Sequence, residues 1–416
     1  MMATELKKET GIRLLLVLCF IFTGCDDKPY ELRSYNYEFY YMINNKQAAD
    51  RMAPFMYNRT DTANPVERFK LVHISDVHVS DRSVDNNYKS PNNLIESVTF
   101  ANQGELRINA MVATGDHISG GLKKEALLYL NSFYTHFYAD NRIPAFPCYG
   151  NHDSNMGKPL QSEYLSRAEL ANAFNNKGNY PLQRPSGKSY YYADVKDPAG
   201  GFIRFIALDM TDQPGFQYDT MKNAVFSQEQ TDWFANVALK QDMTSRHSVI
   251  VLTHYPFQPY RADASTYLID GNFIHTCKLI PEIIEAFRSR SSIQKTFENI
   301  RQSSDARTVA YDFSQSEGEF VCYLGGHAHI FAVFNVEGLS NASEQLLPQR
   351  MILCTNQAAS DAGVVFNRVH REVGGISSNS FSVYSIDTRQ RKIYITCFGS
   401  FDPSSGRAEF PVILDY

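Results

Sequence analysis

Seven side chains that can bind metal ions follow apolar runs at five places in the sequence. In chain order they are Asp76 and His78 after "LVHIS", Asp116 after "MVATG", Asn151 after "FPCYG", His254 after "VIVLT", and His327 and His329 after "VCYLGG". Two carboxylates, one amide and four imidazoles form a donor set that suits Zn, Fe or Mn better than Ca. Seven groups exceed what one such ion takes from a protein. Two ions that share a carboxylate would use them all, and paired ions are suited to hydrolysing phosphate esters.

The elements that must position these residues alternate between strand and helix patterns. Residues 68–75, 108–114 and 143–149 are β-type runs, and residues 90–103 and 123–140 have apolar residues at helical spacing. This order is βαβαβ, which predicts mostly parallel strands with helices packed on them. Because the carboxyl ends of parallel strands line one crevice, the seven side chains are expected to converge there.

The alternation continues along the rest of the chain. Residues 188–195, 201–210 and 247–253 indicate strands, residues 227–241 a helix that begins after Ser227, and residues 281–290 another helix. We expect helix and loop in the polar run that reaches Arg307. The last third is rich in β-type runs and includes a hairpin pattern over 381–399. No internal repeat or low-complexity linker follows residue 66, which favours one large domain over 67–416.

The motifs themselves resemble those of the calcineurin-like metallophosphoesterase superfamily. They are "DVH" (76–78), "GD" (115–116), "GNHD" (150–153), the lone strand-end His254 and "GHAH" (326–329), in that order. The resemblance spans about residues 68–400. It implies an α/β fold, a four-layer αββα sandwich of two mixed β-sheets flanked by helices. It also implies a hydrolase of phosphomonoesters or phosphodiesters that uses two divalent metal ions (Mn, Zn or Fe).

The resemblance further implies a role for each motif residue. Asp76, His78 and His329 would bind the first ion, Asn151, His254 and His327 the second, and Asp116 would bridge both. A hydroxide between the ions would attack phosphorus, and His152 would protonate the leaving oxygen as a general acid. Asp153 would orient the imidazole of His152. His117, directly after the bridging carboxylate, is a candidate for contact with substrate.

Departures from the relatives bear on the metals and the substrate. Purple acid phosphatases carry a Tyr three residues after the bridging Asp, where this chain has Ser119. A tyrosinate-bound ferric ion is therefore not expected. A phosphoester of a small molecule, or a lipid or nucleotide head group, is the expected substrate.

The alternative to a hydrolase is an envelope lipoprotein that binds glycan or protein through a Tyr-rich surface and keeps the metal site only as structure. An intact "HD" pair after Asn151 favours the enzyme, because a structural site needs no acid.

The N-terminus has the pattern of a bacterial lipoprotein export signal. Basic residues precede the short apolar run "LLLVLCFIF", and "FTGC" follows it, ending at Cys25. We expect a signal peptide over 1–24, acylation of Cys25, and a tether with a Tyr-rich segment over 25–66. The protein would then be exported and lipid-anchored to a membrane of the bacterial cell envelope. A plain secretory signal or an uncleaved anchor would give the same basic and apolar pattern.

The net charge and the composition limit the classes of partner that the protein can bind. The formal net charge is −5 and 43% of the residues are hydrophobic. The chain thus has ample material for a core but no basic field for nucleic acid, so a nucleic-acid partner is not expected.

Overall fold

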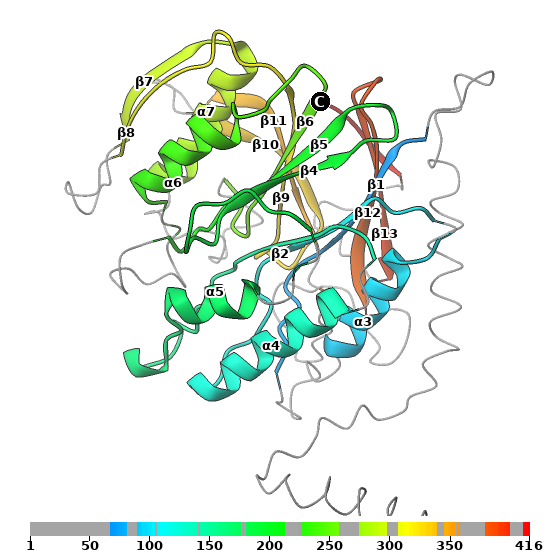
Figure 1. The fold of residues 1–416 in the computed structure, drawn as a ribbon, viewed down its shortest axis with the longest axis vertical. Helices are drawn as coiled ribbons and strands as arrows, with labels where there is room; N and C mark the ends of the chain where they lie inside the picture. The colour runs from blue at the N-terminus through cyan, green and yellow to red at the C-terminus, as the bar shows by residue number, and fades with distance from the viewer. Residues whose placement is uncertain are drawn as a thin grey trace, which may run out of the picture. The chain divides into compact units, whose positions relative to one another are not determined.

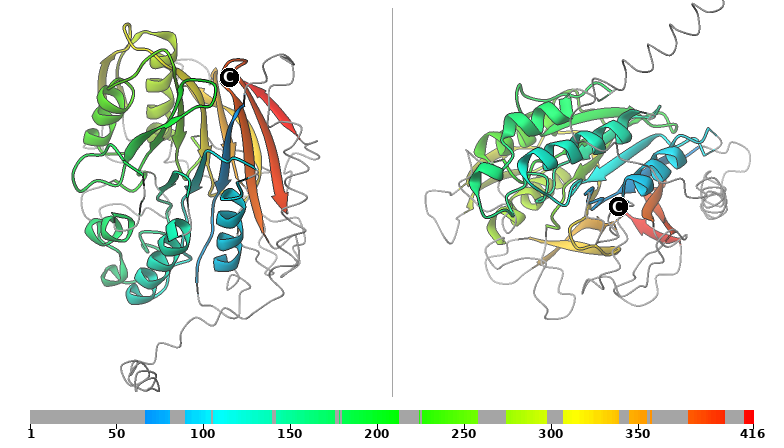
Figure 2. Two further views of the ribbon diagram at one scale, coloured as in Figure 1. Left: turned by 45° about the vertical axis from the view of Figure 1, so that its right-hand side comes forward. Right: turned by 90° about the horizontal axis from the view of Figure 1, so that it is seen from below.

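Two six-stranded mixed β-sheets and their covering helices build the fold (Figures 1 and 2). The computed structural model describes residues 67–80, 90–104, 106–139, 142–175, 178, 180–212, 224, 226–257, 274–297, 307–338, 345–354, 357, 379–399 and 411–416. The predicted signal peptide, Cys25 and the Tyr-rich segment lie outside these residues. Within this part of the chain, no helix is both long and apolar enough to span a membrane.

The first sheet has the strand order β14-β13-β12-β1-β2-β3. Its strands are β1 (Phe69–Ile74), β2 (Ala110–Thr114), β3 (Ala145–Cys148), β12 (Ser380–Asp387), β13 (Lys392–Gly399) and β14 (Val412–Asp415). β1, β2 and β3 are parallel to one another, and β12 pairs with β1 in the antiparallel sense. The predicted βαβαβ unit is therefore confirmed, and the carboxyl ends of its three strands lie at the same edge of the sheet.

The second sheet has the strand order β10-β11-β9-β6-β5-β4. Its strands are β4 (Tyr191–Lys196), β5 (Phe202–Ala207), β6 (His247–Leu252), β9 (Glu319–Gly325), β10 (Ala332–Gly338) and β11 (Gln345–Leu353). β5, β6, β9 and β11 run parallel, whereas the edge strands β4 and β10 are antiparallel to their neighbours. Both sheets are thus mixed, as the resemblance implied.

Helices cover the outer faces of the two sheets (Figures 1 and 2). α3 (Ser90–Ala101) packs on β1 and β2, and α4 (Lys123–Ala139) contacts both α3 and α5 (Arg167–Asn175). α7 (Ile274–Ser289) packs on β9, β10 and β11. α6 (Gln228–Trp233) continues into a π-helical turn, η4 (Phe234–Ala238), and η3 (Gln161–Glu163) is a 3₁₀ turn. The four-layer αββα sandwich is confirmed.

Alternation along the strands separates the core into two parts. In β6, Ile250 and Leu252 join the cluster between the sheets, whereas Val249 and Val251 face the cluster under α7. Both faces of the strand are apolar because both are covered, as expected for a central parallel strand. Phe205 of β5 lies with its ring centroid 5.0 Å from that of Phe146 of β3, so side chains of the two sheets meet directly.

A side-chain hydrogen bond caps the start of α6. The Ser227 side chain accepts a hydrogen bond from the backbone N–H of Gln230, which confirms the predicted start of α6.

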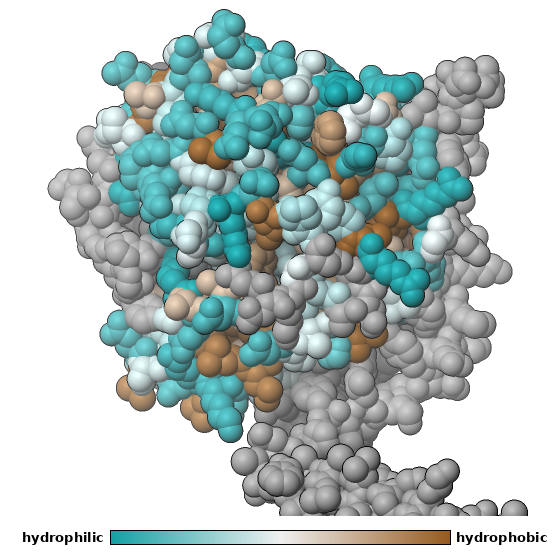
Figure 3. Space-filling model, viewed as in Figure 1, coloured by the Kyte–Doolittle hydropathy of each residue, from teal (hydrophilic) through white to brown (hydrophobic). Residues whose placement is uncertain are grey.

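The expectation of helix and loop before Arg307 was wrong. β7 (Ser292–Phe297) pairs there with β8 (Arg307–Asp312) in an antiparallel ribbon. Exposed and covered residues alternate along this ribbon, and Ser292, Gln294, Thr296, Thr308 and Asp312 lie on its exposed side. Mostly hydrophilic residues cover the face of the molecule in Figure 3.

Candidate metal centre

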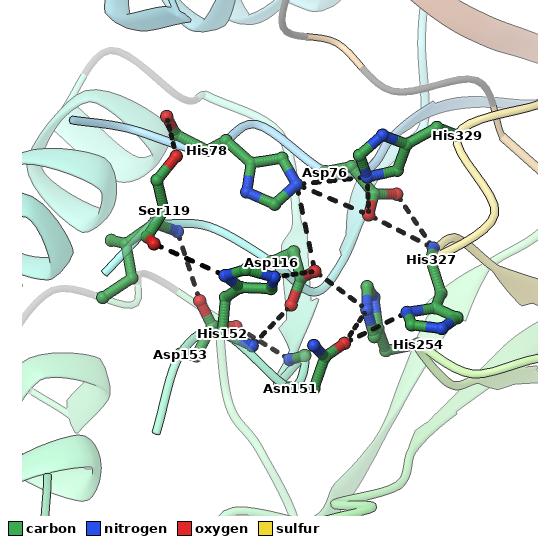
Figure 4. Close-up of polar contacts among 12 residues, drawn as sticks. Asp76, His78, Asp116, Ser119, Asn151, His152, Asp153, His254, His327 and His329 are labelled. Atoms are coloured by element: carbon green, nitrogen blue, oxygen red, sulfur yellow. Dashed lines mark hydrogen bonds and ion pairs between the residues drawn. The ribbon is translucent and has the colours of Figure 1, made fainter. Parts of the chain in front are cut away.

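The seven predicted ligands meet at the carboxyl ends of five strands (Figure 4). They come from the loops after β1 (Asp76, His78), β2 (Asp116), β3 (Asn151), β6 (His254) and β9 (His327, His329). Three groups of ligand atoms, each with atoms within 4.8 Å of one another, contain six of them. Asn151 completes the set through its side-chain oxygen, which lies 2.9 Å from His254 Nε2. The predicted convergence is therefore confirmed.

Asp76, His78 and His329 form the first cluster. The Nε2 atoms of His78 and His329 lie 3.2 Å apart. Asp76 Oδ1 lies 3.3 Å from His329 Nε2 and 3.9 Å from His78 Nε2. Two imidazole nitrogens and one carboxylate oxygen thus point at a common position.

Asp116, Asn151, His254 and His327 form the second cluster. His254 Nε2 lies 3.2 Å from Asp116 Oδ2, and His327 Nδ1 lies 3.1 Å from Asn151 Oδ1. Asp116 Oδ2 is also 3.9 Å from His78 Nε2 of the first cluster. One carboxylate therefore stands between the two clusters.

Five of the seven residues have left-handed backbone conformations. The φ angles are 51° for Asp76, His78 and Asp116, 68° for His327 and 58° for His329. Non-glycine residues seldom adopt such angles, and the strain they carry concentrates at functional sites. Each of these residues turns the chain sharply just after its strand, and the turn directs its side chain to the common position.

Neighbouring groups orient the cluster side chains. His254 Nδ1 donates to the carbonyl of Thr114 at 2.8 Å, which leaves Nε2 facing the second cluster. Ser75 Oγ donates to Asp76 Oδ2 at 2.7 Å. The sequence interpretation missed Ser75 and Thr114. Their only signal is position, since each closes an apolar run just before a ligand motif.

Burial and charge set the protonation of the cluster in the metal-free protein. Burial lowers the pKa of His78 to about 4, although Asp116 opposes the shift. Burial, with the charge of His254, lowers the pKa of His327 to about 3. Burial raises the pKa of Asp116, but the charges of His254 and His152 outweigh it, so this carboxyl stays ionised. Neutral imidazoles and ionised carboxylates are the forms that bind metal ions, so the donor set fits divalent cations.

The pKa of His254 shifts in the opposite direction to those of His78 and His327. Burial lowers its pKa, but the carboxylate of Asp116, 3.2 Å away, dominates and raises the pKa to about 9. The raised pKa stabilises the metal-free fold. This contribution is fully present below the ordinary pKa of 6.5 and is lost as pH rises through about 9.

Metal affinity at the second cluster should therefore rise with pH. A cation must displace the proton of His254, so the affinity for Mn²⁺ is expected to increase by up to about tenfold per pH unit and to level off near pH 9. Calorimetric titration of metal-free protein between about pH 6.5 and 8.5, in buffers of different ionisation enthalpy, measures both affinity and proton release. Equal affinity across this range, with no proton released, would contradict the assignment of His254.

His152 lies beside the two clusters with its side chain 33% exposed. Its Nε2 is 3.9 Å from Asp116 Oδ2, and its Nδ1 faces the carbonyl of Ser119 at 3.4 Å. The imidazole is thus open to solvent next to the shared carboxylate, as a proton donor to a substrate would need to be.

Two predictions about neighbouring residues were wrong. Asp153 does not orient His152, because its carboxylate faces the backbone N–H groups of His117 and Gly150 instead. His117 does not reach a substrate. It is fully buried, and its ring stacks on Phe133 with centroids 4.0 Å apart. In both cases the backbone direction after the strand, which sequence does not show, turns the side chain inward.

Comparison with known proteins identifies the family. The sequence profile described as calcineurin-like phosphoesterase matches residues 69–331. No curated protein matches the sequence significantly.

Similar solved structures include a purple acid phosphatase, PPD1, from yellow lupin (Lupinus luteus) seeds. It is 11% identical to this chain with a TM-score of 0.44, and the match covers 83% of this chain and 53% of that one. Another is PhoD, 10% identical with a TM-score of 0.41, covering 79% of this chain and 69% of that one. This chain therefore spans about half the length of the lupin enzyme it matches. The chain belongs to the calcineurin-like phosphoesterase family.

Proposed function

We propose that this protein hydrolyses phosphomonoesters or phosphodiesters with two divalent ions, Mn, Zn or Fe, held by the two clusters. The observation that carries the proposal is the pair of histidine and carboxylate clusters with Asp116 between them, its Oδ2 3.2 Å from His254 and 3.9 Å from His78. Asp76, His78 and His329 would hold the first ion. Asn151, His254 and His327 would hold the second. Asp116 would serve both.

Bound ions would supply positive charge that offsets the charge of the phosphoryl oxygens and makes water a better nucleophile near neutral pH. The protein side chains supply the rest. Asp116 and Asp76 would balance the charge of the ions, and the buried imidazoles of His78 and His254 would hold their part of the donor set in place. The exposed His152 is placed to hand a proton to the departing oxygen.

The orientation of His152 supports this role. The carbonyl of Ser119 can only accept a hydrogen bond, so Nδ1 of His152 carries a proton when the two interact at 3.4 Å. Nε2 then faces Asp116 and solvent, so it is the ring nitrogen through which a proton would pass to or from a substrate. Ser119 also donates through Oγ to the carbonyl of His78 at 3.1 Å. Because residue 119 is a serine, its side chain offers no phenolate to bind a ferric ion.

The alternative is a binding protein with a purely structural metal site. Its Tyr-rich segment lies outside the described residues. His152, at 33%, is more exposed than His329, at 24%, and the other ligands Asp76, His78, Asp116, Asn151 and His254 are buried. This exposure favours catalysis, because a structural site gains nothing from an open imidazole.

Hydrolysis of p-nitrophenyl phosphate and bis-p-nitrophenyl phosphate tests the proposal. With Mn²⁺ or Zn²⁺ added, we expect turnover of at least one substrate, and the preferred one separates a phosphomonoesterase from a phosphodiesterase. His152→Ala should lower kcat by about 10²–10⁴-fold while metal content stays unchanged. His136→Ala, on the partly exposed surface of α4, is the control and should retain wild-type kcat. Fully metal-loaded protein that turns over neither substrate would favour the binding protein.

A further inference from the structure

Asp153 joins two of the four loops that carry the second cluster. Its Oδ2 accepts a hydrogen bond from the backbone N–H of Gly150 at 2.7 Å. Its Oδ1 accepts from the N–H of His117 at 2.8 Å and from that of Ile118 at 3.3 Å. The side chain is fully buried. One carboxylate therefore links the loop after β2, which carries Asp116, to the loop after β3.

The two loops touch at backbone distance where Asp153 links them. A Cβ atom added to Gly150 would lie 2.2 Å from the backbone nitrogen of Asp116. The backbone N–H of His152 donates to Asp116 Oδ1 at 2.8 Å. Any shift between the loops would therefore move the shared carboxylate relative to Asn151 and His152 together.

His117 supports Asp153 from the side of α4. Its Nδ1 lies 3.1 Å from Asp153 Oδ2, within ion-pair distance but outside the direction of a hydrogen bond. Its ring stacks on Phe133 of α4 and meets the edge of Tyr134. The imidazole thus fills the space behind the carboxylate and connects the linked loops to the helix.

The hydrogen bonds of Asp153 lie within two loops. Its partners among the described residues are Gly150, His117 and Ile118, all in the loops after β2 and β3. The first cluster comes from the loops after β1 and β9. We propose that Asp153 is a positioning residue for the second metal ion: it sets the separation of Asp116 and Asn151 and leaves Asp76, His78 and His329 in place. This inference rests on the proposed function.

Asp153→Asn tests the proposal, because it keeps the shape of the side chain and replaces one acceptor oxygen by a donor that faces N–H groups. Calorimetric titration of the metal-free full-length chain with Mn²⁺ should show one ion bound about 10–100-fold more weakly than in the wild type. The other ion, which Asp76, His78 and His329 still hold, should lose clearly less affinity. Raising Mn²⁺ should restore most of kcat, which simple loss of stability at a distant position would not produce.

Asp197→Asn is the matched control. Asp197 is also buried, and it accepts hydrogen bonds from the Ala199 N–H and the Thr388 hydroxyl. It follows β4, which runs antiparallel to β5, so it lies at the end of the sheet away from the clusters. The control should bind both ions with wild-type affinity, whatever its change in thermal stability.

A second variant, His117→Phe, keeps the stacking on Phe133 but removes the nitrogen beside Asp153. It should lower the affinity for the same ion by a smaller factor. If Asp153→Asn does not fold, this variant decides whether Asp153 positions the second ion. An equal loss of affinity for both ions, or no loss for either, overturns the positioning role. Wild-type protein that binds no pair of ions would instead overturn the proposed function, so the two failures are distinguishable.

Discussion

Replacing Asp116 by Asn is expected to lower kcat for phosphoester hydrolysis on the order of 10³-fold. Its Oδ2 lies 3.2 Å from His254 and 3.9 Å from both His78 and His152, so one carboxylate serves both clusters and faces the proposed acid. An amide of the same shape removes the negative charge that offsets two dications. Steady-state kinetics and metal content, measured on the same sample, report the two effects separately.

Asp242→Asn is the matched control for this substitution. Asp242 is exposed and has a φ of 55°, close to the 51° of Asp116, so the same exchange is made in the same backbone conformation away from the clusters. The control should keep wild-type kcat. An Asp116→Asn enzyme with kcat within about threefold of the wild type would show that this carboxylate is not the shared ligand.

Gly150→Ala is expected to abolish tight metal binding. The added Cβ would lie 2.2 Å from the backbone nitrogen of Asp116 and 2.3 Å from its Oδ1. The first of these atoms belongs to the backbone and cannot rotate away, so the two loops must separate. Overpacking of this kind costs about 1–3 kcal/mol in unfolding free energy, and the separation also moves Asp116 away from Asn151. Metal content after dialysis and thermal unfolding measure the two consequences.

Gly104→Ala provides the comparison, because no described residue other than its chain neighbours has an atom within 4 Å of the Cβ position there. It should leave metal content and activity unchanged. Retention of two ions by Gly150→Ala, with unchanged kinetics, would mean that the contact between the loops does not hold the second cluster.

The convergence of the ligands was predictable from the order of the elements. Asp76, Asp116 and Asn151 each follow a strand of the βαβαβ unit, and parallel strands end at one edge. His254 and His327 follow β6 and β9, which are parallel to each other in the other sheet. Motif spacing and strand alternation therefore indicate which residues meet, although the strands belong to two different sheets.

The partners of individual side chains were not predictable. Asp153 follows His152 directly, and adjacency suggested that the two interact. The carboxylate instead turns inward to His117 and to backbone N–H groups, whereas the imidazole turns out toward solvent. Sequence gives the residue types, but Asp153 finds its partner His117 in the loop after β2, 36 residues away along the chain. Such a distant contact cannot be read from adjacency.

The β7–β8 ribbon shows a second limit. Its residues alternate between exposed and covered positions, but Ser292, Gln294 and Lys295 give it too little apolar character for a strand signal. Pairing between Phe297 and Arg307, across a stretch of chain that lies outside the described residues, fixes the ribbon. Such tertiary pairing overrides local propensity.

Crystallography at the Mn absorption edge tests the central claim most directly. Crystals grown with Mn²⁺ should show two anomalous peaks about 3.5–4 Å apart. One should lie among Asp76, His78 and His329, the other should lie beside Asn151 and His254, and a carboxylate oxygen of Asp116 should lie between them. A single peak, or none at the carboxyl ends of these strands, would contradict a shared two-metal centre.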